Sequence, residues 1–463
     1  MLRPSSSVEG VVPYLLCFLL GGFVLPGCAS TPPPPPAAPT DSTAASLSYQ
    51  VFPSGLRLVV REDPRADQVA VNVSFRVGAS DEPAGKEGIA SLAATLTSLA
   101  RHGGLSAPRW VDRLSALGAK SEHFTLYDET EFWTTAAQAR LPQLVKLEAQ
   151  RMRDPLASVT EEDFQQARTQ AVAMLRLRYE TDSEGAQSRW LNEKLLQGHP
   201  YGRPLMGTPE SLARLTLEEV RAFVKEHYTP AHAVLVVSSA LPTVDVKFEV
   251  AQGFVSLTNT GRAEHTPPVQ RLPPPLPESV RRGTPMEIVH GKVRAPQLYL
   301  VWMVPGLYSG QYFAPIFAAG GLNVWVKRRL QGDARVQAIR TEYREADGLT
   351  LLITTLTLRE DLRSEQEVRR VAEYGLDMLG LIEDVLAGEV GHHLYRATLA
   401  QIHEQQRANP IANVARTLRA TGRVDALRVR EQQLVERHGW VSISYLRKYL
   451  HADQVRMMLV LPN

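Results

Sequence analysis

The end of the chain repeats a pattern found near its middle, and this repeat constrains the fold more than any other feature. Residues 223–228 have the character of a helix and lead through a turn into the apolar run 234–236. Residues 445–450 lead in the same way into the apolar run 457–460, about 220 residues later. A helix, a turn and a terminal strand at two such places predict a duplicated α+β unit.

Each of the two predicted units begins with strands and continues with helices. Val69, Val71, Val73, Phe75 and Val77 alternate with less apolar residues, which predicts a strand of a sheet with one covered face. Helices are predicted at 88–101 and at about 108–117, 141–153, 160–180 and 185–197, and a capping box at Thr216–Glu219 opens another before a strand at 233–237. In the second unit, strands are predicted at 298–302 and 350–354, and helices at 313–330 and about 365–387 and 394–421.

The N-terminus has the composition of an export signal. Arg3 is followed by the short apolar segment 14–25 and then by Leu25-Pro26-Gly27-Cys28, which resembles a bacterial lipobox. This resemblance implies cleavage before Cys28, diacylation of its thiol and a membrane-anchored lipoprotein at the periplasmic face. Ala29 favours the outer over the inner membrane. The alternative is an ordinary signal peptide with a chance cysteine.

Composition excludes several classes of protein. The chain is 44% hydrophobic and 22% charged, which is typical of globular domains with sizeable cores. The net charge of +2 gives no indication of a nucleic-acid partner. The only cysteines are Cys17 and Cys28, so a chain cleaved before Cys28 can form no internal disulfide and is held together by its cores.

Two proline-rich stretches divide the chain into five predicted parts. One contains the unbroken run 32–36 and cannot bury apolar surface, so it is predicted to be a tether, and the other lies at 266–277. The predicted parts are a lipoprotein signal peptide (1–27), a tether (28–47), an N-terminal domain (48–245), a linker region (246–284) and a C-terminal domain (285–463).

Several motifs together resemble the pitrilysin/insulinase-type metallopeptidases, a family that includes the mitochondrial processing peptidases. These motifs are Gly55-Leu56-Arg57, 75–83 (FRVGASDEP), 117–119 (LGA), 128–130 (DET), 199–204 (HPYGRP), Gly207-Thr208, 228–230 (YTP) and Gly320-Gly321. The resemblance covers about residues 49–463. It implies two homologous α+β domains, each a mixed and mostly antiparallel sheet packed with helices, which form half of a clam-shell. Such enzymes take unfolded peptides, which add as a strand to a sheet edge beside the zinc.

The metal positions of that family are replaced in this chain. In an active member, a His-x-x-Glu-His helix supplies two zinc ligands and the general base, and a later helix supplies a third ligand. The resemblance places Ser91, Ala94 and Thr95 at the three positions of the first helix and Ala173, within a residue or two, at the later one. Hydroxyls are poor zinc ligands and alanine cannot act as a base, so the resemblance implies no zinc cofactor and no catalytic residue.

Other histidines offer a weak alternative for metal binding. His392 and His393 are adjacent, so they point in different directions on a helix. Glu389 is spaced from them as on a solvated helix face. Glu122 and His123 stand where the family shows an Asn-Ala pair on its substrate-binding strand, and we interpret them as a polar edge with Glu122 on the substrate side.

The second half of such enzymes also contributes an arginine and, seven residues later, a tyrosine that steady the substrate carbonyl. Arg328 or Arg329 could occupy the arginine position, with Arg329 as the substrate-side candidate. The tyrosine position falls near Arg335 or Val336, so this element is incomplete as well. The alternative for both arginines is a charged helix end.

Three functions follow from these observations. The first is a membrane-tethered, non-catalytic subunit that pairs with a zinc-bearing homologous peptidase and contributes to peptide binding and proteolysis. The second is a stand-alone peptide-binding or structural envelope lipoprotein. The third is a zinc endopeptidase with atypical ligands.

Overall fold

A computed structural model of the chain describes residues 45–181, 183–257, 286–306, 314–330, 332–362, 364–376, 396, 410–426, 445, 448–451 and 454–463. Residues 43–463 belong to one compact unit. Among the described helices, none combines the length and the apolar character that crossing a membrane requires. The predicted signal peptide, the predicted lipidation site Cys28, the proline-rich run at 266–277 and the histidine pair His392-His393 lie outside the described residues.

The first sheet has six strands in the order β1-β2-β6-β3-β5-β4. The strands are β1 (Ser46–Val51), β2 (Arg57–Glu62), β3 (Gln68–Phe75), β4 (Lys120–Thr125), β5 (Thr130–Ala137) and β6 (Ala233–Ser239). Strand β6, the last in sequence, inserts between β2 and β3, and it runs parallel to β2. All other neighbours are antiparallel. The sheet is therefore mixed and mostly antiparallel, with β1 and β4 at its edges.

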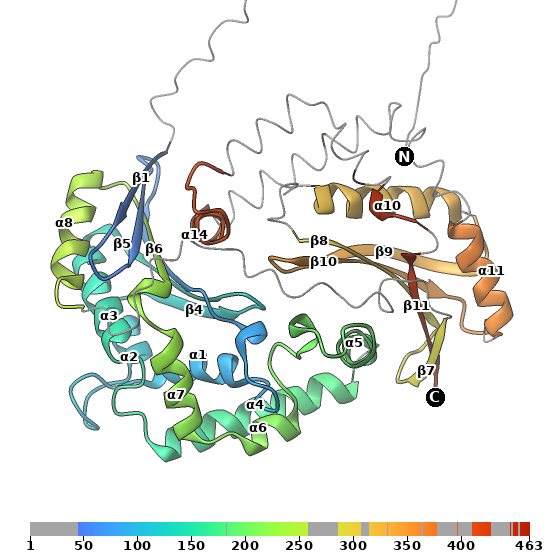
Figure 1. Ribbon diagram of the computed structural model, residues 1–463, viewed down its shortest axis with the longest axis horizontal. Helices are drawn as coiled ribbons and strands as arrows, with labels where there is room; N and C mark the ends of the chain where they lie inside the picture. Colours follow the sequence, from blue (N-terminus) through green and yellow to red (C-terminus); the bar gives the residue numbers. More distant parts are fainter. Residues whose placement is uncertain are drawn as a thin grey trace, which may run out of the picture. The chain divides into compact units, whose positions relative to one another are not determined.

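The second sheet repeats this topology with five strands in the order β7-β11-β8-β10-β9. The strands are β7 (Glu287–Gly291), β8 (Gln297–Pro305), β9 (Val336–Glu345), β10 (Leu349–Leu358) and β11 (Arg456–Pro462). The last strand again inserts beside the first, and β7–β11 is the one parallel pair. Removing β1 from the first sheet leaves the same order and the same directions (Figure 1). The predicted duplication of an α+β unit is confirmed.

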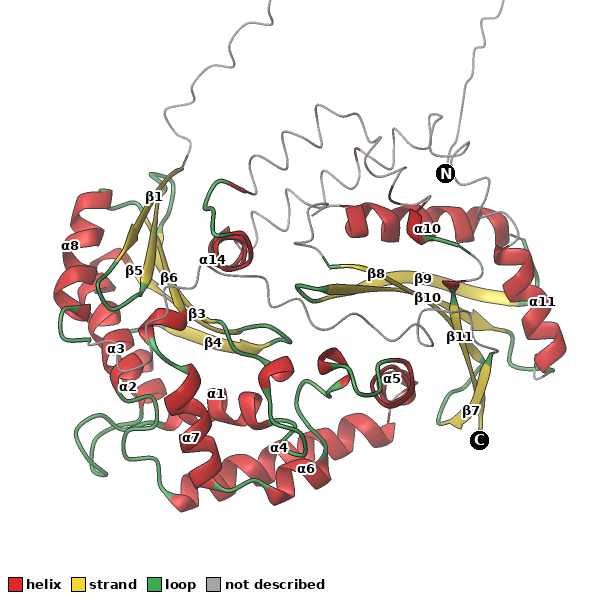
Figure 2. Ribbon diagram, viewed as in Figure 1, coloured by secondary structure: helices red, strands yellow, loops and turns green. Residues whose placement is uncertain are grey.

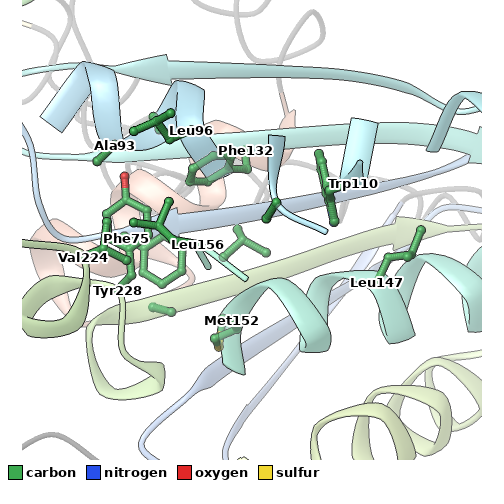
Figure 3. Packing of buried hydrophobic residues seen from close by; sticks show 14 of the residues in the cluster. Phe75, Ala93, Leu96, Trp110, Phe132, Leu147, Met152, Leu156, Val224 and Tyr228 are labelled. Carbon is green, nitrogen blue, oxygen red and sulfur yellow. The ribbon is translucent and has the colours of Figure 1, made fainter. Parts of the chain in front are cut away.

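Helices of the first half cover one face of the first sheet. Apart from α5 (Ser183–Arg189), whose Ala186 packs on the second sheet, they are α1 (Ile89–Leu99), α2 (Trp110–Ala116), α3 (Leu141–Arg153), α4 (Glu161–Thr181), α6 (Pro209–Arg214), α7 (Leu217–His227) and α8 (Thr243–Phe254). Their apolar sides join the inward residues of β2, β3 and β6 in one core, in which the Phe75 ring stacks on Tyr228 with centroids 4.6 Å apart (Figure 3). The predicted helices of this half are confirmed, including the Thr216 capping box that begins α7.

The opposite face of the first sheet is also covered, which the alternating pattern of β3 did not indicate. Helix α14 (Pro410–Thr421) lies against β3 and β6. Its Ile411, Val414, Ala415 and Leu418 pack on Val59, Val234 and Val236. Asn72 and Ser74 of β3 are fully buried on this side. The expectation of one covered face is therefore wrong, because the covering helix comes from the other half of the chain.

A segment of the first half packs on the second sheet in a similar way. Ala186, Trp190 and Leu191 lie against Val301, Ile353 and other residues of one sheet face. The Trp190 indole donates to Glu287 at 2.8 Å. The other face of this sheet packs against α10 (Ala314–Leu330) and α11 (Glu365–Leu376) around Trp302 (Figure 2).

The boundary of the first domain differs from the prediction. Helix α8 occupies the first nine residues of the expected linker region 246–284. Its Val246, Val250 and Phe254 are buried in the first core, so this domain extends to at least Leu257. Strand β1 likewise begins at Ser46, inside the expected tether 28–47.

Candidate functional site

Helix α1 carries the positions that the resemblance assigns to zinc. Ala94 is fully buried in the first core, and Ser91 and Thr95 are half-buried on the side that faces β4. The Thr95 hydroxyl donates to the Ser91 carbonyl at 3.1 Å and lies 3.4 Å from Nε2 of His123 on β4. The Thr95 hydroxyl and the His123 imidazole thus connect α1 to β4.

The surroundings of His123 favour its neutral form. Burial lowers the pKa of His123, and the charge of Arg151 lowers that pKa further. Arg151 is buried, pairs with Glu148 and lies over the Phe132 ring, 3.8 Å from its centroid. Among the described residues, the imidazole contacts the Phe132 ring and the Thr95 hydroxyl, and its hydrogen bonds include no carboxylate that would orient it as a metal ligand.

A buried carboxylate fixes the start of α1. Glu82 accepts from the backbone N–H groups of Gly88 and Ala90, both at 3.0 Å. These N–H groups have no partner within the helix, so a side-chain acceptor at this end stabilises it. Burial nevertheless raises the pKa of Glu82 to about 8, against the lowering effect of the two backbone donors.

Two glycines allow α1 to approach the loop that precedes α6. Gly88 and Gly207 both have positive φ angles, of 94° and 74°. A Cβ atom on Gly207 would lie 2.3 Å from the carbonyl oxygen of Glu87, and one on Gly88 would lie 2.6 Å from that of Met206. The Ser211 hydroxyl donates to the Glu87 carbonyl at 2.7 Å and completes the contact.

The 199–204 motif connects the same loop to other parts of the chain. Arg203 donates to the Ser80 carbonyl at 2.7 Å, next to the segment that leads to Glu82. The Tyr201 hydroxyl donates to Asp128 at 2.9 Å and accepts from the Gly348 N–H at 3.1 Å. The motif therefore positions α1 and the turn after β4 instead of supplying reactive groups.

The other predicted site residues are dispersed. Ala173 is exposed on α4, whereas its neighbours Ala171 and Leu175 pack toward the first core. Glu122 is exposed on β4, and the alternation of the strand places it on the face opposite His123. Arg329 lies over the Tyr374 ring, 3.6 Å from its centroid, and donates to the Tyr374 carbonyl.

The structure therefore brings Ser91, Ala94, Thr95 and His123 together at α1 and β4. Ala173, Glu122 and Arg329 do not belong to this group. Tetrahedral zinc requires imidazole, thiolate or carboxylate donors at about 2.0–2.3 Å. The α1–β4 site offers one imidazole and two hydroxyls, and Ala94 has no donor. Within the described ranges, no group of three His, Cys, Asp or Glu side chains is placed to hold a metal ion. The residues at the predicted zinc positions do not fit zinc.

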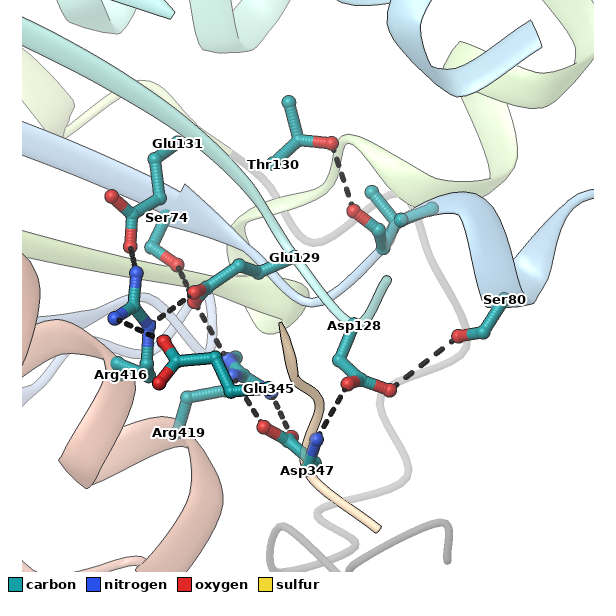
Figure 4. Close-up of polar contacts among 12 residues, drawn as sticks. Ser74, Ser80, Asp128, Glu129, Thr130, Glu131, Glu345, Asp347, Arg416 and Arg419 are labelled. Atoms are coloured by element: carbon teal, nitrogen blue, oxygen red, sulfur yellow. Dashed lines mark hydrogen bonds and ion pairs between the residues drawn. The ribbon is translucent and has the colours of Figure 1, made fainter. Parts of the chain in front are cut away.

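A second polar site, which the sequence did not reveal, joins α14 to both sheets. We call it the ionic cluster, and it consists of Asp128, Glu129, Glu131, Glu345, Asp347, Arg416 and Arg419 (Figure 4). Glu129 accepts from Arg416 at 2.5 Å and from Arg419 at 3.0 Å. Arg419 also pairs with Asp347, whose N–H donates to Asp128 at 2.8 Å. A cavity of about 20 Å³ lies among these residues, room for about one water molecule.

Five carboxylates in this cluster face two arginines, and the pKa values of three of them shift in different directions. Burial raises the pKa of Glu129, but Arg416 and Arg419 outweigh it and lower that pKa to about 2. Burial, with Asp347 adding to it, raises the pKa of Asp128 to about 7. Burial together with Glu129 raises the pKa of Glu131 to about 8. The cluster thus holds Glu129 ionised and favours protons on Asp128 and Glu131, as expected of like charges in a buried site.

Comparisons with known proteins agree with this architecture. The family model of the insulinase peptidases (peptidase family M16) matches residues 57–209, and that of the M16 inactive domain matches residues 214–344. An uncharacterized zinc protease of Mycobacterium leprae is 26% identical over 226 residues, which are 48% of this chain and 49% of that protein. The zinc protease PqqE of Helicobacter pylori is 27% identical over 225 residues, 48% of this chain and 49% of its own. The chain thus spans about half the length of the curated relatives it matches.

Solved structures share the fold over nearly the whole chain. A protease from Helicobacter pylori superposes with a TM-score of 0.76 at 17% identity and covers 90% of this chain and 100% of its own. A peptidase M16 inactive domain from Pseudomonas fluorescens gives a TM-score of 0.74 at 14% identity and covers 90% and 98%. The chain belongs to the insulinase (M16) peptidase family, and the predicted resemblance is confirmed.

Proposed function

We propose that this chain is a non-catalytic M16 protein that binds extended peptides at the β4 edge and serves as partner subunit of a zinc-bearing homologue. One observation carries the proposal. The edge strand β4 and the helix α1 beside it are both present, while the helix positions assigned to zinc hold a buried methyl group and two hydroxyls. A site that retains its strand edge and lacks its metal donors can bind a peptide without cleaving it.

The β4 edge supports peptide binding by its geometry. Strand β4 ends the sheet, and β5 is its one partner among the described strands. Its other side therefore presents backbone N–H and C=O groups to an added strand. Alternate side chains of such a peptide would point toward Thr95 and His123, which supply polar contacts without a catalytic group.

Backbone pairing at β4 is tested with an unstructured fluorescent peptide and two N-methylated versions, each methylated at one alternate set of residues. Only one alternate set directs its N–H groups to β4, so methylation of that set weakens binding at least tenfold in an anisotropy titration. Methylation of the other set serves as the matched control. Equal affinity for all three peptides, or no affinity for the first, contradicts binding by strand addition.

The partner role is tested by capturing the tagged full chain from its own cells in mild detergent. We expect an M16 homologue with an intact His-x-x-Glu-His motif in about equimolar amount, and peptidase activity that chelation of zinc abolishes. Recovery of the chain alone, or with unrelated envelope proteins, contradicts the partner role and favours the stand-alone peptide-binding lipoprotein.

We also propose that a lipid on Cys28 tethers the chain to a membrane. Acyl chains contribute about 0.8 kcal/mol per buried CH₂ group, so a diacylated cysteine gives stable anchoring. Incorporation of a labelled fatty acid into the wild-type chain, and its loss in Cys28→Ser, is the expected result. Label that persists in the variant, or that the wild-type chain never takes up, contradicts the tether.

A further inference from the structure

Helix α8 has an exposed apolar side in addition to its buried one. The buried side consists of Val246, Val250 and Phe254, which belong to the first core. Four exposed apolar residues follow one another at steps of four, three and four positions: Val244, Phe248, Ala251 and Val255. Val255 continues the helical backbone for one residue beyond Phe254. We call these four residues the α8 stripe.

The stripe forms one continuous surface along the helix. At about 100° per residue, its four members lie within an arc of about 60°, centred about 130° from the buried side. Its three large residues, Val244, Phe248 and Val255, are 70%, 60% and 80% exposed. The charged residues of α8 all fall outside this arc: Asp245, Lys247 and Glu249. A surface helix normally has one apolar side, so the second side requires its own explanation.

The stripe is too small to form a stable protein interface by itself. Each of its three large side chains offers on the order of 100 Å² of apolar surface, whereas a stable interface buries roughly 800 Å² per partner. A lipid bilayer imposes no such threshold, because an amphipathic helix at the bilayer surface is held by the apolar side that it inserts. The uninterrupted apolar arc of the α8 stripe suits this mode of binding.

The first strand of the chain begins close to the start of α8. Ser46, the first residue of β1, pairs with Glu62 of β2. The Glu62 carboxylate accepts from the N–H and the hydroxyl of Thr243, at 2.8 and 2.7 Å, where α8 begins (Figure 1). One strand spacing of about 4.8 Å and one glutamate side chain therefore separate Ser46 from α8, a distance of less than about 15 Å.

The predicted tether is long enough for α8 to lie on the bilayer that holds it. The 17 residues from 29 to 45 separate Cys28 from β1, and an extended proline-rich chain of this length spans about 50 Å. The stripe extends about 17 Å along the helix axis, so both of its ends are within reach of the bilayer. The tether also makes insertion of the stripe an intramolecular step, which requires much less intrinsic affinity.

We propose that the α8 stripe inserts into the surface of the lipid bilayer to which the chain is tethered. This inference rests on the proposed lipid anchor at Cys28. Lys247 lies next to the arc, so its ammonium group can reach lipid phosphates while its stem stays at the apolar boundary. Helix α8 packs on β2, and β4 lies four strand spacings away, at about 19 Å. Docking through α8 therefore leaves the proposed peptide edge at the other side of the sheet.

Quenchers carried by lipids test this contact directly. The full chain with Cys17→Ser is expressed with its signal sequence, reconstituted in vesicles of phosphatidylethanolamine and phosphatidylglycerol, and floated on a density gradient. Lipidation blocks the Cys28 thiol, so Val244→Cys or Val255→Cys provides one site for a polarity-sensitive dye. Nitroxide-labelled lipid should quench the dye at both positions by half or more. Leu177→Cys on α4, at a residue 67% exposed, is the matched control and should show little quenching.

Two substitutions in the stripe measure its contribution to docking. In the chain labelled at position 255, Phe248→Asp should lower the ratio of docked to undocked helix at least about tenfold, because burial of one such side chain is worth that factor or more. Phe248→Leu should retain most of the quenching. A ratio that Phe248→Asp leaves unchanged overturns the proposal.

The other outcomes separate the docking from the anchor. A chain that floats with the vesicles but shows no quenching at positions 244 and 255, or equal quenching at 177, overturns the docking and leaves the anchor intact. A chain that does not float contradicts the anchor and overturns the docking that rests on it. Dye emission typical of an apolar environment that lipid quenchers leave unchanged also overturns the proposal, because protein, such as a second copy, then covers the stripe.

Discussion

Removing Arg419 should destabilise the protein more than removing any exposed arginine, because the buried Glu129 and the half-buried Asp347 both pair with it. Its guanidinium is 2% exposed and bonds to Glu129 and Asp347. Replacement by methionine keeps much of the volume but leaves Glu129 buried with only Arg416 beside it. Breaking one side of a buried ion pair costs about 3–5 kcal/mol. At about 2–4 °C per kcal/mol for a domain of 150–250 residues, Arg419→Met should lower Tm by about 10 °C.

Thermal unfolding followed by circular dichroism measures this effect, and Arg423→Met provides the control. Arg423 lies just beyond the end of α14 and pairs with Asp425, but it is 62% exposed, so screening by water leaves its pair nearly neutral for stability. Its removal should change Tm by less than about 2 °C. Similar Tm values for the two variants would refute the reasoning, because burial would then add nothing to the cost of losing the arginine.

Two further predictions concern α1. The pKa of Glu82 is raised from 4.5 to about 8, so the folded state holds a proton that the unfolded state releases, and stability falls as pH rises from about 4.5 to 8. Glu82→Gln should therefore flatten the fall of Tm measured between pH 5 and 8.5. An unchanged slope would contradict the assignment. Gly207→Ala should lower the free energy of unfolding by about 1–3 kcal/mol, since its Cβ would meet the Glu87 carbonyl at a positive φ. Denaturant unfolding should show a smaller loss of stability for Gly85→Ala, because position 85 has open space around it. Equal losses would exclude the clash.

Local periodicity was sufficient to predict most individual elements. The alternation in β3 and the capping box at Thr216 depend on neighbours in sequence, and the structure contains both. Helix α8 carries an equally local signal, with Val246, Val250 and Phe254 at helical spacing. The nearby proline-rich stretch led to a linker prediction for these residues, which is wrong.

Contacts between distant parts of the chain were not predictable from one sequence. Nothing local to Arg416 and Arg419 indicates partners about 290 residues earlier, at Glu129. For the same reason, the apolar side of α14 gave no indication that it covers the second face of the first sheet. The sequence singles out both Thr95 and His123, but it does not predict their contact. That contact depends on how α1 packs against β4 in the tertiary fold.

Zinc stoichiometry of the purified full chain tests the central claim most directly. The chain is incubated with excess zinc, dialysed and analysed by mass spectrometry of its metal content, alongside His123→Ala. The donor set of one imidazole and two hydroxyls predicts much less than one zinc per chain, with no difference between the two proteins. One zinc per wild-type chain that is lost in His123→Ala would contradict the account, because the α1–β4 site would then be a metal centre.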